Sequence, residues 1–164
     1  TRNCYTIIYP DSLPWVGYLF LVPGFGETAE DVLLQTKLPV ETAKKGILTI
    51  IPTFQDGVSS FGFDSLSQQA FHRIVDDVTN RYKLQNSEYY LGGFSMGGST
   101  VVKFAETADK KPKAVFAIDS PLDFITLQNG MSCCLERVGL TKRTYIFICF
   151  QGSSKSWVER LRRH

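Results

Sequence analysis

A serine flanked by glycines is the pattern in this chain best suited to chemistry. The segment Gly93-Phe94-Ser95-Met96-Gly97 has the spacing G-x-S-x-G and lies between an apolar run and a stretch with helical periodicity. This context predicts a sharp strand-to-helix turn, in which the two glycines make room for a strained serine. Such a turn would raise the Ser95 hydroxyl above the carboxyl edge of a sheet, beside the free N–H groups of a helix start. The pattern therefore predicts nucleophilic attack by Ser95, with the N–H of Met96 as one donor to the oxyanion.

Two other interpretations of this glycine-rich segment stay open. The first is a tight turn that only packs a helix close to a strand and carries no chemistry. The second is a phosphate-binding loop, which is the weaker alternative because the segment has neither the G-x-x-x-x-G-K-[ST] nor the G-x-G-x-x-G spacing.

Strands and helices are expected to alternate along the chain and to hold this turn in place. Apolar and β-branched runs predict strands at Cys4–Tyr9, Gly17–Val22, Ile47–Ile51, Tyr89–Leu91, Ala114–Ile118 and Tyr145–Phe150. Capping residues and 3.6-residue periodicity predict helices from Thr28, from Pro39 to Gly46, over Ser65–Tyr82 and over Met96–Ala108. This order favours a doubly wound, three-layer α/β/α sandwich with a mainly parallel sheet, in a single domain over residues 1–164.

The helix over Ser65–Tyr82 is predicted to be amphipathic. Its apolar side is expected to consist of Leu66, Ala70, Phe71, Ile74, Val75, Val78 and Tyr82. His72 falls on the opposite, polar side, which is typical of a solvated surface histidine.

Composition excludes several classes of protein. The formal net charge is only +2, and no Lys/Arg run is interleaved with aromatic residues, so we expect neither nucleic acid nor a membrane surface as a partner. No run approaches the roughly 20 apolar residues that span a bilayer, so a soluble protein is expected. The four cysteines lack metal-ligand spacing, and we expect no metal and no organic cofactor. Compartment and oligomeric state are not encoded in these patterns.

The chain resembles the α/β-hydrolase superfamily, in particular its compact esterase branch of carboxylesterase, feruloyl-esterase and dienelactone-hydrolase-like proteins. The matching residues run from Gly17 to about Phe124 and include the G-x-S-x-G turn and the segment Pro23-Gly24-Phe25-Gly26. The resemblance implies that this segment supplies the second oxyanion donor, with Pro23 where many members have histidine. By that resemblance the donor is the N–H of Phe25, and Gly24 and Gly26 let the backbone approach the substrate oxygen. A glycine turn before a capped helix explains the two glycines equally well when they are taken alone.

The resemblance also implies that a histidine base follows the serine in the chain. The chain has two histidines, His72 and His164. His72 precedes Ser95, so it does not fit this order. His164 fits the order but is the last residue of a basic terminal stretch, and chain ends are often mobile.

Two aspartates are candidates for the catalytic acid. Asp119 and Asp123 follow the strand Ala114–Ile118, and sheet enzymes place catalytic groups at the carboxyl ends of strands. A role in a turn or a helix cap is the alternative. The resemblance more often implies an acid after the next strand, where this chain has Gln151 and Gly152.

This departure from the family pattern has three explanations. The chain is a truncated hydrolase, a degenerate homologue that binds without turnover, or an enzyme with an unusual base; the first is favoured. The change in composition after about Gln128 also suggests an altered or out-of-frame gene end. Resequencing the source gene through this region would overturn that hypothesis if the original reading frame proved continuous.

The expected activity is hydrolysis of a small-molecule carboxylic ester, with thioesters and peptides less favoured, through an acyl-enzyme at Ser95. The loop Thr53–Asp64 contains Phe61, which is expected either to line the substrate pocket or to fold onto the core. The alternatives are a catalytically impaired homologue that acts as a binding module, and a structural domain whose partner surface includes residues 155–164.

Overall fold

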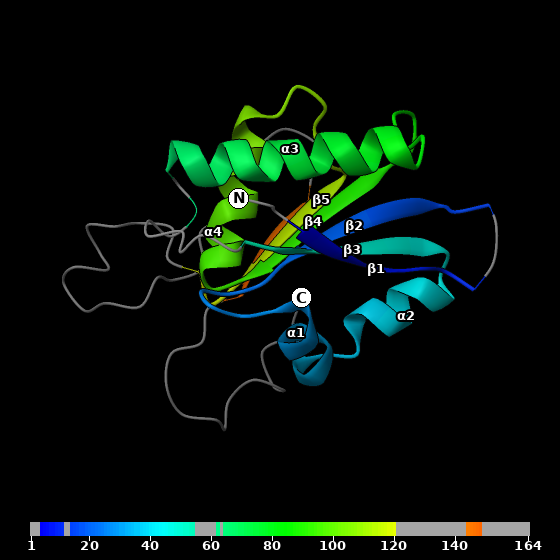
Figure 1. Cartoon of the computed structure of the whole chain (residues 1–164), viewed down its shortest axis with the longest axis horizontal. Coiled ribbons are helices and arrows are strands. Elements are labelled where there is room, and N and C mark those ends of the chain that lie inside the picture. The colour runs from blue at the N-terminus through cyan, green and yellow to red at the C-terminus, as the bar shows by residue number, and fades with distance from the viewer. Residues whose placement is uncertain (1–3, 12–13, 55–61, 63, 121–143, 149–164) are drawn as a thin grey trace.

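A computed structural model describes residues 4–11, 14–54, 62, 64–120 and 144–148 of the chain. Ten elements follow one another in these residues (Figure 1). They are β1 (Cys4–Ile8), β2 (Gly17–Val22), α1 (Ala29–Gln35), α2 (Leu38–Lys44), β3 (Ile47–Thr53), α3 (Ser65–Arg81), β4 (Tyr89–Phe94), α4 (Met96–Thr107), β5 (Ala114–Ile118) and β6 (Thr144–Ile148).

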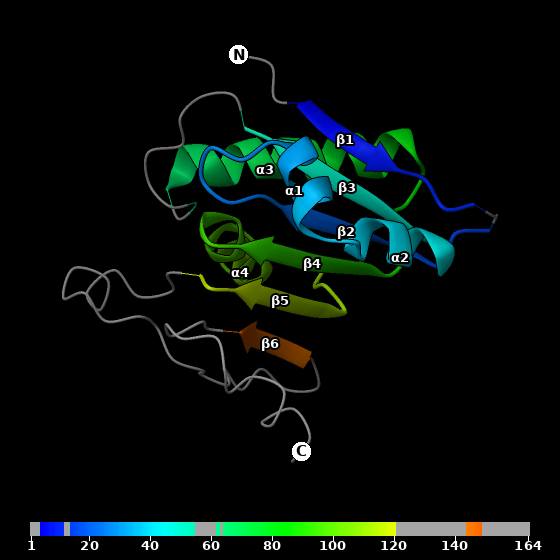
Figure 2. The ribbon, with the colours of Figure 1, turned by 90° about the horizontal axis from the view of Figure 1, so that it is seen from below.

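The strands form one mainly parallel sheet in the order β1-β3-β2-β4-β5-β6. Only β1 runs antiparallel to its neighbour, β3, and the other four pairings are parallel (Figure 2). The turn after β1 therefore does not join two neighbouring strands, because β3 lies between β1 and β2. The predicted mainly parallel sheet is confirmed.

Helices cover both faces of the sheet, as the alternating side chains of β2 require. Tyr18 and Phe20 pack in the cluster on the side of α3 and α4, whereas Leu19 and Leu21 pack with the buried residues of α1. The helices lie on both sides of the sheet (Figure 1). Successive side chains of a strand point to opposite faces, and all four of these are buried. The three-layer α/β/α arrangement is thus confirmed.

The short helices begin and end where the local signals place them. The Thr28 side chain accepts the Asp31 N–H and the Asp31 carboxylate accepts the Thr28 N–H, so both halves of a capping box are present at α1. After α2, Gly46 has φ +76°, the left-handed conformation that ends many helices. These ends aim the chain from β2 across one face of the sheet and back into β3.

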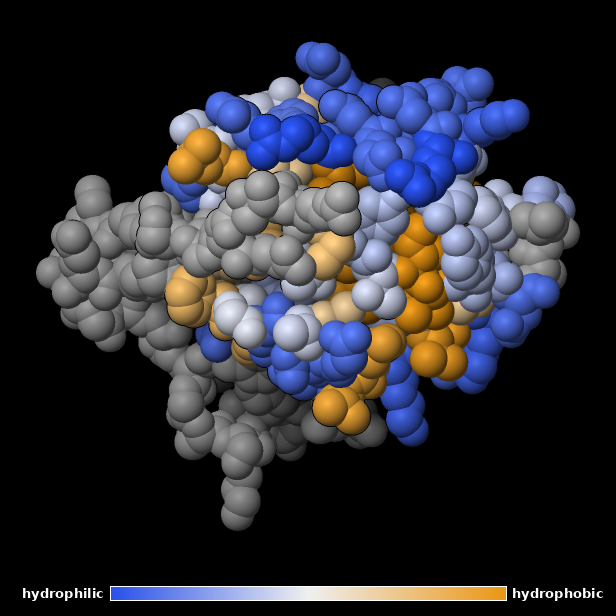
Figure 3. All heavy atoms as spheres, viewed as in Figure 1, coloured by the Kyte–Doolittle hydropathy of each residue, from blue (hydrophilic) through white to orange (hydrophobic). Residues whose placement is uncertain are grey.

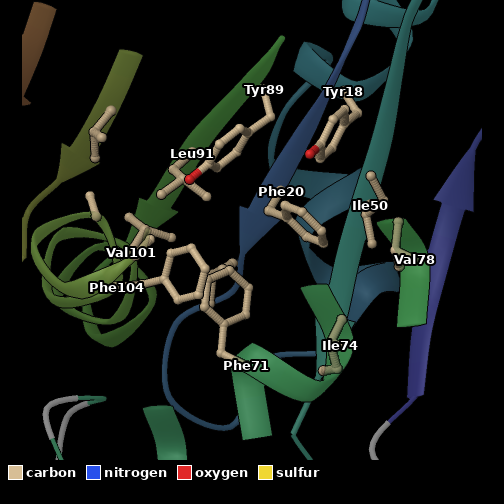
Figure 4. Packing of buried hydrophobic residues seen from close by; sticks show 14 of the residues in the cluster. Tyr18, Phe20, Ile50, Phe71, Ile74, Val78, Tyr89, Leu91, Val101 and Phe104 are labelled. Carbon is tan, nitrogen blue, oxygen red and sulfur yellow. The ribbon is translucent and has the colours of Figure 1, made fainter. Parts of the chain in front are cut away.

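The larger part of the core lies between the sheet and α3. Phe71 of α3 is fully buried, and its ring lies 5.6 Å from that of Phe20 and 4.8 Å from that of Phe104 in α4 (Figure 4). Ile74 and Val78 continue the same buried stripe one and two turns later (Figure 4). The outer side of α3 is hydrophilic (Figure 3).

Two residues of α3 lie differently from the sequence prediction. Leu66 is 73% exposed, because Ser67 occupies the buried position in the first turn of the helix. His72 is half-buried, with its ring centre 4.6 Å from that of Phe104, and so is not a solvated surface histidine. A single domain over residues 1–164 stays a prediction.

Candidate active site

Ser95 occupies a tight turn that joins β4 directly to α4. Its backbone has φ 51° and ψ −121°, a region that residues with a Cβ rarely adopt. Conformations of this kind cost about 1–3 kcal/mol and persist only where the surroundings hold them. Here the Ser95 N–H donates to the Ile118 carbonyl at 2.9 Å, and the Ser95 carbonyl accepts the N–H groups of Gly98 and Ser99 at 3.1 and 3.2 Å. Neighbours on both sides of the turn therefore hold the strained conformation.

Gly93 and Gly97 permit this turn because no side chain would fit at either position. A Cβ on Gly93 would overlap the backbone of Gly97, and a Cβ on Gly97 would overlap the carbonyl oxygens of Val22 and Pro23. The first turn of α4 consequently packs directly against the carboxyl end of β2. The spacing G-x-S-x-G thus reflects close backbone approach on both sides of Ser95.

The loop after β2 lies beside this turn, as both ribbon views show (Figures 1 and 2). Gly24 is buried, and a Cβ on it would lie 3.4 Å from Cδ1 of Phe94. The Glu27 N–H donates to the Gly24 carbonyl at 3.2 Å, and Gly26 between them has φ +75°. A turn with glycine in the left-handed region at its third position results. Phe25, at the tip of the turn, is 64% exposed.

Glu27 closes the same turn with its side chain. Its Oε2 accepts the Gly24 N–H at 2.6 Å, and its Oε1 accepts a hydrogen bond from Nε2 of Gln35 at 2.7 Å. The N–H of Gly24 is therefore directed to this carboxylate, and the N–H of Phe25 is the next one along the loop. Sequence reasoning did not single out Glu27, because a carboxylate just before a helix cap has the pattern of an ordinary solvated charge.

Asp119 follows β5 at the same edge of the sheet as Ser95. The register pairs Phe94 with Ile118, so Ser95 and Asp119 each come directly after a paired residue. Asp119 is half-buried and has φ 49°, a second non-glycine residue in the left-handed region beside the serine turn. Ser120, next in the chain, is buried and packs where a Cβ on Gly98 would lie.

The structure thus brings together the backbone of Ser95, Met96, the Gly24–Glu27 turn and Asp119. Asp123, His164 and Phe61 lie outside the described residues, so their predicted roles stay predictions. His72 packs against Phe104, in the third turn of α4.

The start of α4 provides the electrostatic setting of the site. α4 is 12 residues long and has no acidic residue in its first turn, so no side chain of that turn offsets the positive end of the helix dipole beside Ser95. This arrangement can stabilise negative charge that develops on an oxygen near the serine.

Neither a metal centre nor a membrane-spanning helix is evident in the part of the chain that the structure describes. Those residues contain no group of three or more His, Cys, Asp or Glu side chains that could hold a metal ion. None of their helices is both long and apolar enough to cross a membrane.

A hollow of about 320 Å³ lined by Glu88, Lys110 and Lys113 lies at the opposite end of β4 from Ser95, so it does not belong to this site.

Comparisons with known proteins identify the fold of this chain. No protein-family model matches the chain, and no curated protein matches its sequence. Among solved structures, a thermostable carboxyl esterase from Bacillus coagulans matches with a TM-score of 0.58 at 17% identity, over 71% of this chain and 39% of that one. A monoglyceride lipase from Saccharomyces cerevisiae matches with a TM-score of 0.58 at 18% identity, over 77% of this chain and 44% of that one. The chain has the α/β-hydrolase fold.

The α/β-hydrolase fold agrees with the resemblance drawn from the sequence. A third structure with this fold, the fluorophosphonate-binding serine hydrolase F of Staphylococcus aureus, matches with a TM-score of 0.59 at 16% identity, over 84% of this chain and 57% of its own. The chain therefore spans between 39% and 57% of the length of these three proteins. Similarity at these identities establishes the fold alone.

Proposed function

We propose that this protein is a serine hydrolase that cleaves small-molecule carboxylic esters through an acyl-enzyme at Ser95. The observation that carries this proposal is the strained backbone of Ser95 between β4 and α4, at φ 51° and ψ −121°, beside the Gly24–Glu27 turn. Backbone strain is characteristic of functional sites, where surrounding structure holds a reactive group in place. The matched esterases and lipases support the same reaction class.

In the proposed reaction, the Ser95 hydroxyl oxygen attacks the ester carbonyl carbon as a base removes its proton. The carbonyl oxygen becomes an oxyanion and accepts the N–H groups of Met96 and Phe25, while Gly24 and Gly26 leave room for the substrate at the loop. Collapse of the intermediate breaks the bond to the alcohol oxygen, which takes up the proton held by the base, and leaves an acyl group on Ser95. Water then hydrolyses this acyl-enzyme, which releases the carboxylic acid and restores the Ser95 hydroxyl. Phe61 is proposed to contact the substrate.

Asp119 is the proposed acid within the described residues, because it follows β5, the neighbour of β4, and β4 ends directly before Ser95. Asp123 is an alternative acid, and His164 is the candidate base by its order in the chain. An acid that orients the base and stabilises its protonated form would complete this set of groups.

The proposal is tested by labelling the protein with a fluorophosphonate probe and then measuring turnover of short p-nitrophenyl esters. Labelling of the wild type that disappears in Ser95→Ala and persists in Ser65→Ala, a matched exposed serine in α3, is the expected result. Ester turnover that is lost in Ser95→Ala would establish that Ser95 carries out the hydrolysis. A wild type that neither labels nor turns over ester would contradict the proposal.

A second candidate is a homologue that binds esters or related ligands without turning them over. It is favoured by the histidines: His72 packs its ring against Phe104, and the only other histidine in the sequence is His164. Absence of Ser95 labelling is the result that this candidate predicts, because a serine hydroxyl without a base is a poor nucleophile. Labelling without ester turnover would instead mean that the nucleophile and the oxyanion donors are intact and that deacylation is lost.

A further inference from the structure

We infer that Glu27 is a positioning residue that sets the direction of the Phe25 N–H, and this inference rests on the proposed function. Glu27 closes the Gly24–Glu27 turn twice. Its backbone N–H donates to the Gly24 carbonyl at 3.2 Å, and its Oε2 accepts the Gly24 N–H at 2.6 Å. A hydrogen bond to a carboxylate is about twice as strong as one between neutral groups. Both peptide groups that flank Gly24 are thereby tied to one residue.

Gln35 holds the Glu27 carboxylate in this orientation. Its Nε2 donates to Oε1 at 2.7 Å from the last residue of α1, so each carboxylate oxygen has its own donor. α1 is itself anchored to the sheet by the buried residues Ala29 and Val32. The turn is consequently held in position by the helix α1 as well as by β2.

The turn needs this clamp because its other restraints are one-sided. Gly24 packs against Phe94 and follows Pro23, whose carbonyl lies against Gly97, so the inner end of the loop is fixed by the serine turn. At the outer end, Gly26 has φ +75°, and no atom among the described residues lies within 4 Å of where its Cβ would be. Glycine has more backbone freedom than any other residue. Without Glu27, rotation about Gly24 and Gly26 would turn the Phe25 N–H away from the oxyanion.

Glu27 acts through the loop and does not contact the reacting atoms in this scheme. A carboxylate beside a developing oxyanion would repel it, and both Glu27 oxygens are already engaged by donors. The useful consequence is geometric: capture of the Gly24 N–H by Glu27 leaves the next N–H, that of Phe25, as the donor of the loop. Misplacement of a catalytic group by about 1 Å can cost about 100-fold in rate.

The test compares Glu27→Ala and Glu27→Gln with Glu30→Ala. Glu30 is an exposed acid in the first turn of α1, so it controls for loss of charge near the same helix start. The readouts are the maximal inactivation rate constant and the probe affinity in fluorophosphonate labelling, the melting temperature, and the amide chemical shift of Gly24 by NMR.

Glu27→Ala is expected to lower the maximal inactivation rate constant by about 10- to 100-fold, while probe affinity stays within about twofold. Glu27→Gln keeps an oxygen that can accept the Gly24 N–H, so its rate constant is expected to stay within about threefold of wild type. The Gly24 amide signal should move upfield in Glu27→Ala, and by a smaller amount in Glu27→Gln, where a neutral acceptor remains. Gln35→Ala, which removes one exposed partner of the carboxylate, should lower the rate constant by about two- to fivefold.

Equal rate constants for Glu27→Ala and Glu30→Ala would overturn the inference and leave the proposed function intact. Equal losses in Glu27→Ala and Glu27→Gln would also overturn it, since the acceptor alone is then not sufficient. If the wild type shows no Ser95-dependent labelling, the proposed function itself fails and takes the inference with it. If Glu27→Ala does not fold, Glu27→Gln and Gln35→Ala decide the question by the same comparison.

Discussion

At Ser95 the backbone carries strain that a glycine would relieve. A residue with a Cβ is strained at φ 51°, whereas glycine is not, although glycine loses more entropy on folding. We therefore expect Ser95→Gly to be about 1 kcal/mol more stable than Ser95→Ala, with both variants losing fluorophosphonate labelling. Urea unfolding measures the difference. Equal stability of the two variants would show that the turn relaxes without strain.

At Gly97 even the smallest side chain would overlap backbone atoms. A Cβ there would overlap the carbonyl oxygens of Val22 and Pro23, which are backbone atoms in or beside β2 and cannot move aside. Gly97→Ala is expected to lose about 1–3 kcal/mol of stability and to abolish labelling of Ser95. Gly26→Ala is the control, because its added Cβ has room and costs only the left-handed φ, about 1 kcal/mol. A Gly97→Ala protein that unfolds at the wild-type urea concentration would contradict this account.

How far single residues could be predicted from the sequence depended on how local their signals are. Ser95 and its two glycines could be found because the strained turn imposes small neighbours at fixed spacing. Asp119 could be placed next to Ser95 because carboxyl ends of parallel strands meet at one edge of the sheet. Glu27 could not, since its contact with Gly24 exists only once the turn has formed.

Among the elements, α1 carries a pH-dependent contribution to stability through its capping box. The Thr28 backbone N–H and hydroxyl both donate to the Asp31 carboxylate at 2.8 Å, and they lower the pKa of Asp31 below its ordinary 3.8. The folded state therefore binds this proton less tightly than the unfolded state. The stabilisation is present above pH 3.8 and is lost as the pH falls through the folded-state pKa.

Asp31→Asn is accordingly expected to unfold at a lower urea concentration than wild type at pH 7. The gap between the two proteins should narrow as the pH falls below 3.8, since the wild-type carboxylate is then protonated as well. Asp76→Asn, at an exposed position in α3, controls for the change of charge. A gap of constant size across this pH range would show that the cap works without the carboxylate charge.

Helix positions were predictable where caps and periodicity agreed, as at α1 and α3. Which residues of α3 are buried was less predictable at two positions. Leu66 fits the apolar spacing, yet Ser67 holds the buried position in that turn. The ring of His72 packs against the ring of Phe104 in α4. Periodicity describes one helix, whereas burial depends on what lies opposite.

At the scale of the whole molecule, Phe71 joins the sheet to two helices. It is fully buried and contacts the rings of Phe20 in β2 and Phe104 in α4 (Figure 4). Phe71→Ala is expected to cost about 3–5 kcal/mol of unfolding free energy, because the layers cannot collapse onto the space left behind. Leu66→Ala, five residues earlier on the same helix and largely exposed, should stay within about 0.5 kcal/mol of wild type. Chemical denaturation compares the two, and similar losses would contradict the assigned core.

The order of strands was the part of the fold that sequence patterns could not define. Each run indicated a strand, and alternation with helices indicated a parallel sheet, but nothing local states that β3 enters between β1 and β2. The local patterns also do not show that β1 alone runs antiparallel to its neighbour. Which strands pair depends on the whole sheet, because the pairing must bury the apolar faces of all strands together.

The contact of Gly97 with the end of β2 has a consequence for how the protein folds. The two segments are separated along the chain by α1, α2, β3, α3 and β4. Forming this contact therefore costs the entropy of closing a long loop before the contact itself contributes any stability. Contacts of this long range form slowly compared with helices. Recovery of the Ser95 conformation during refolding is therefore expected to follow the slow, global phase, after α3 and α4 have already gained their helical signal.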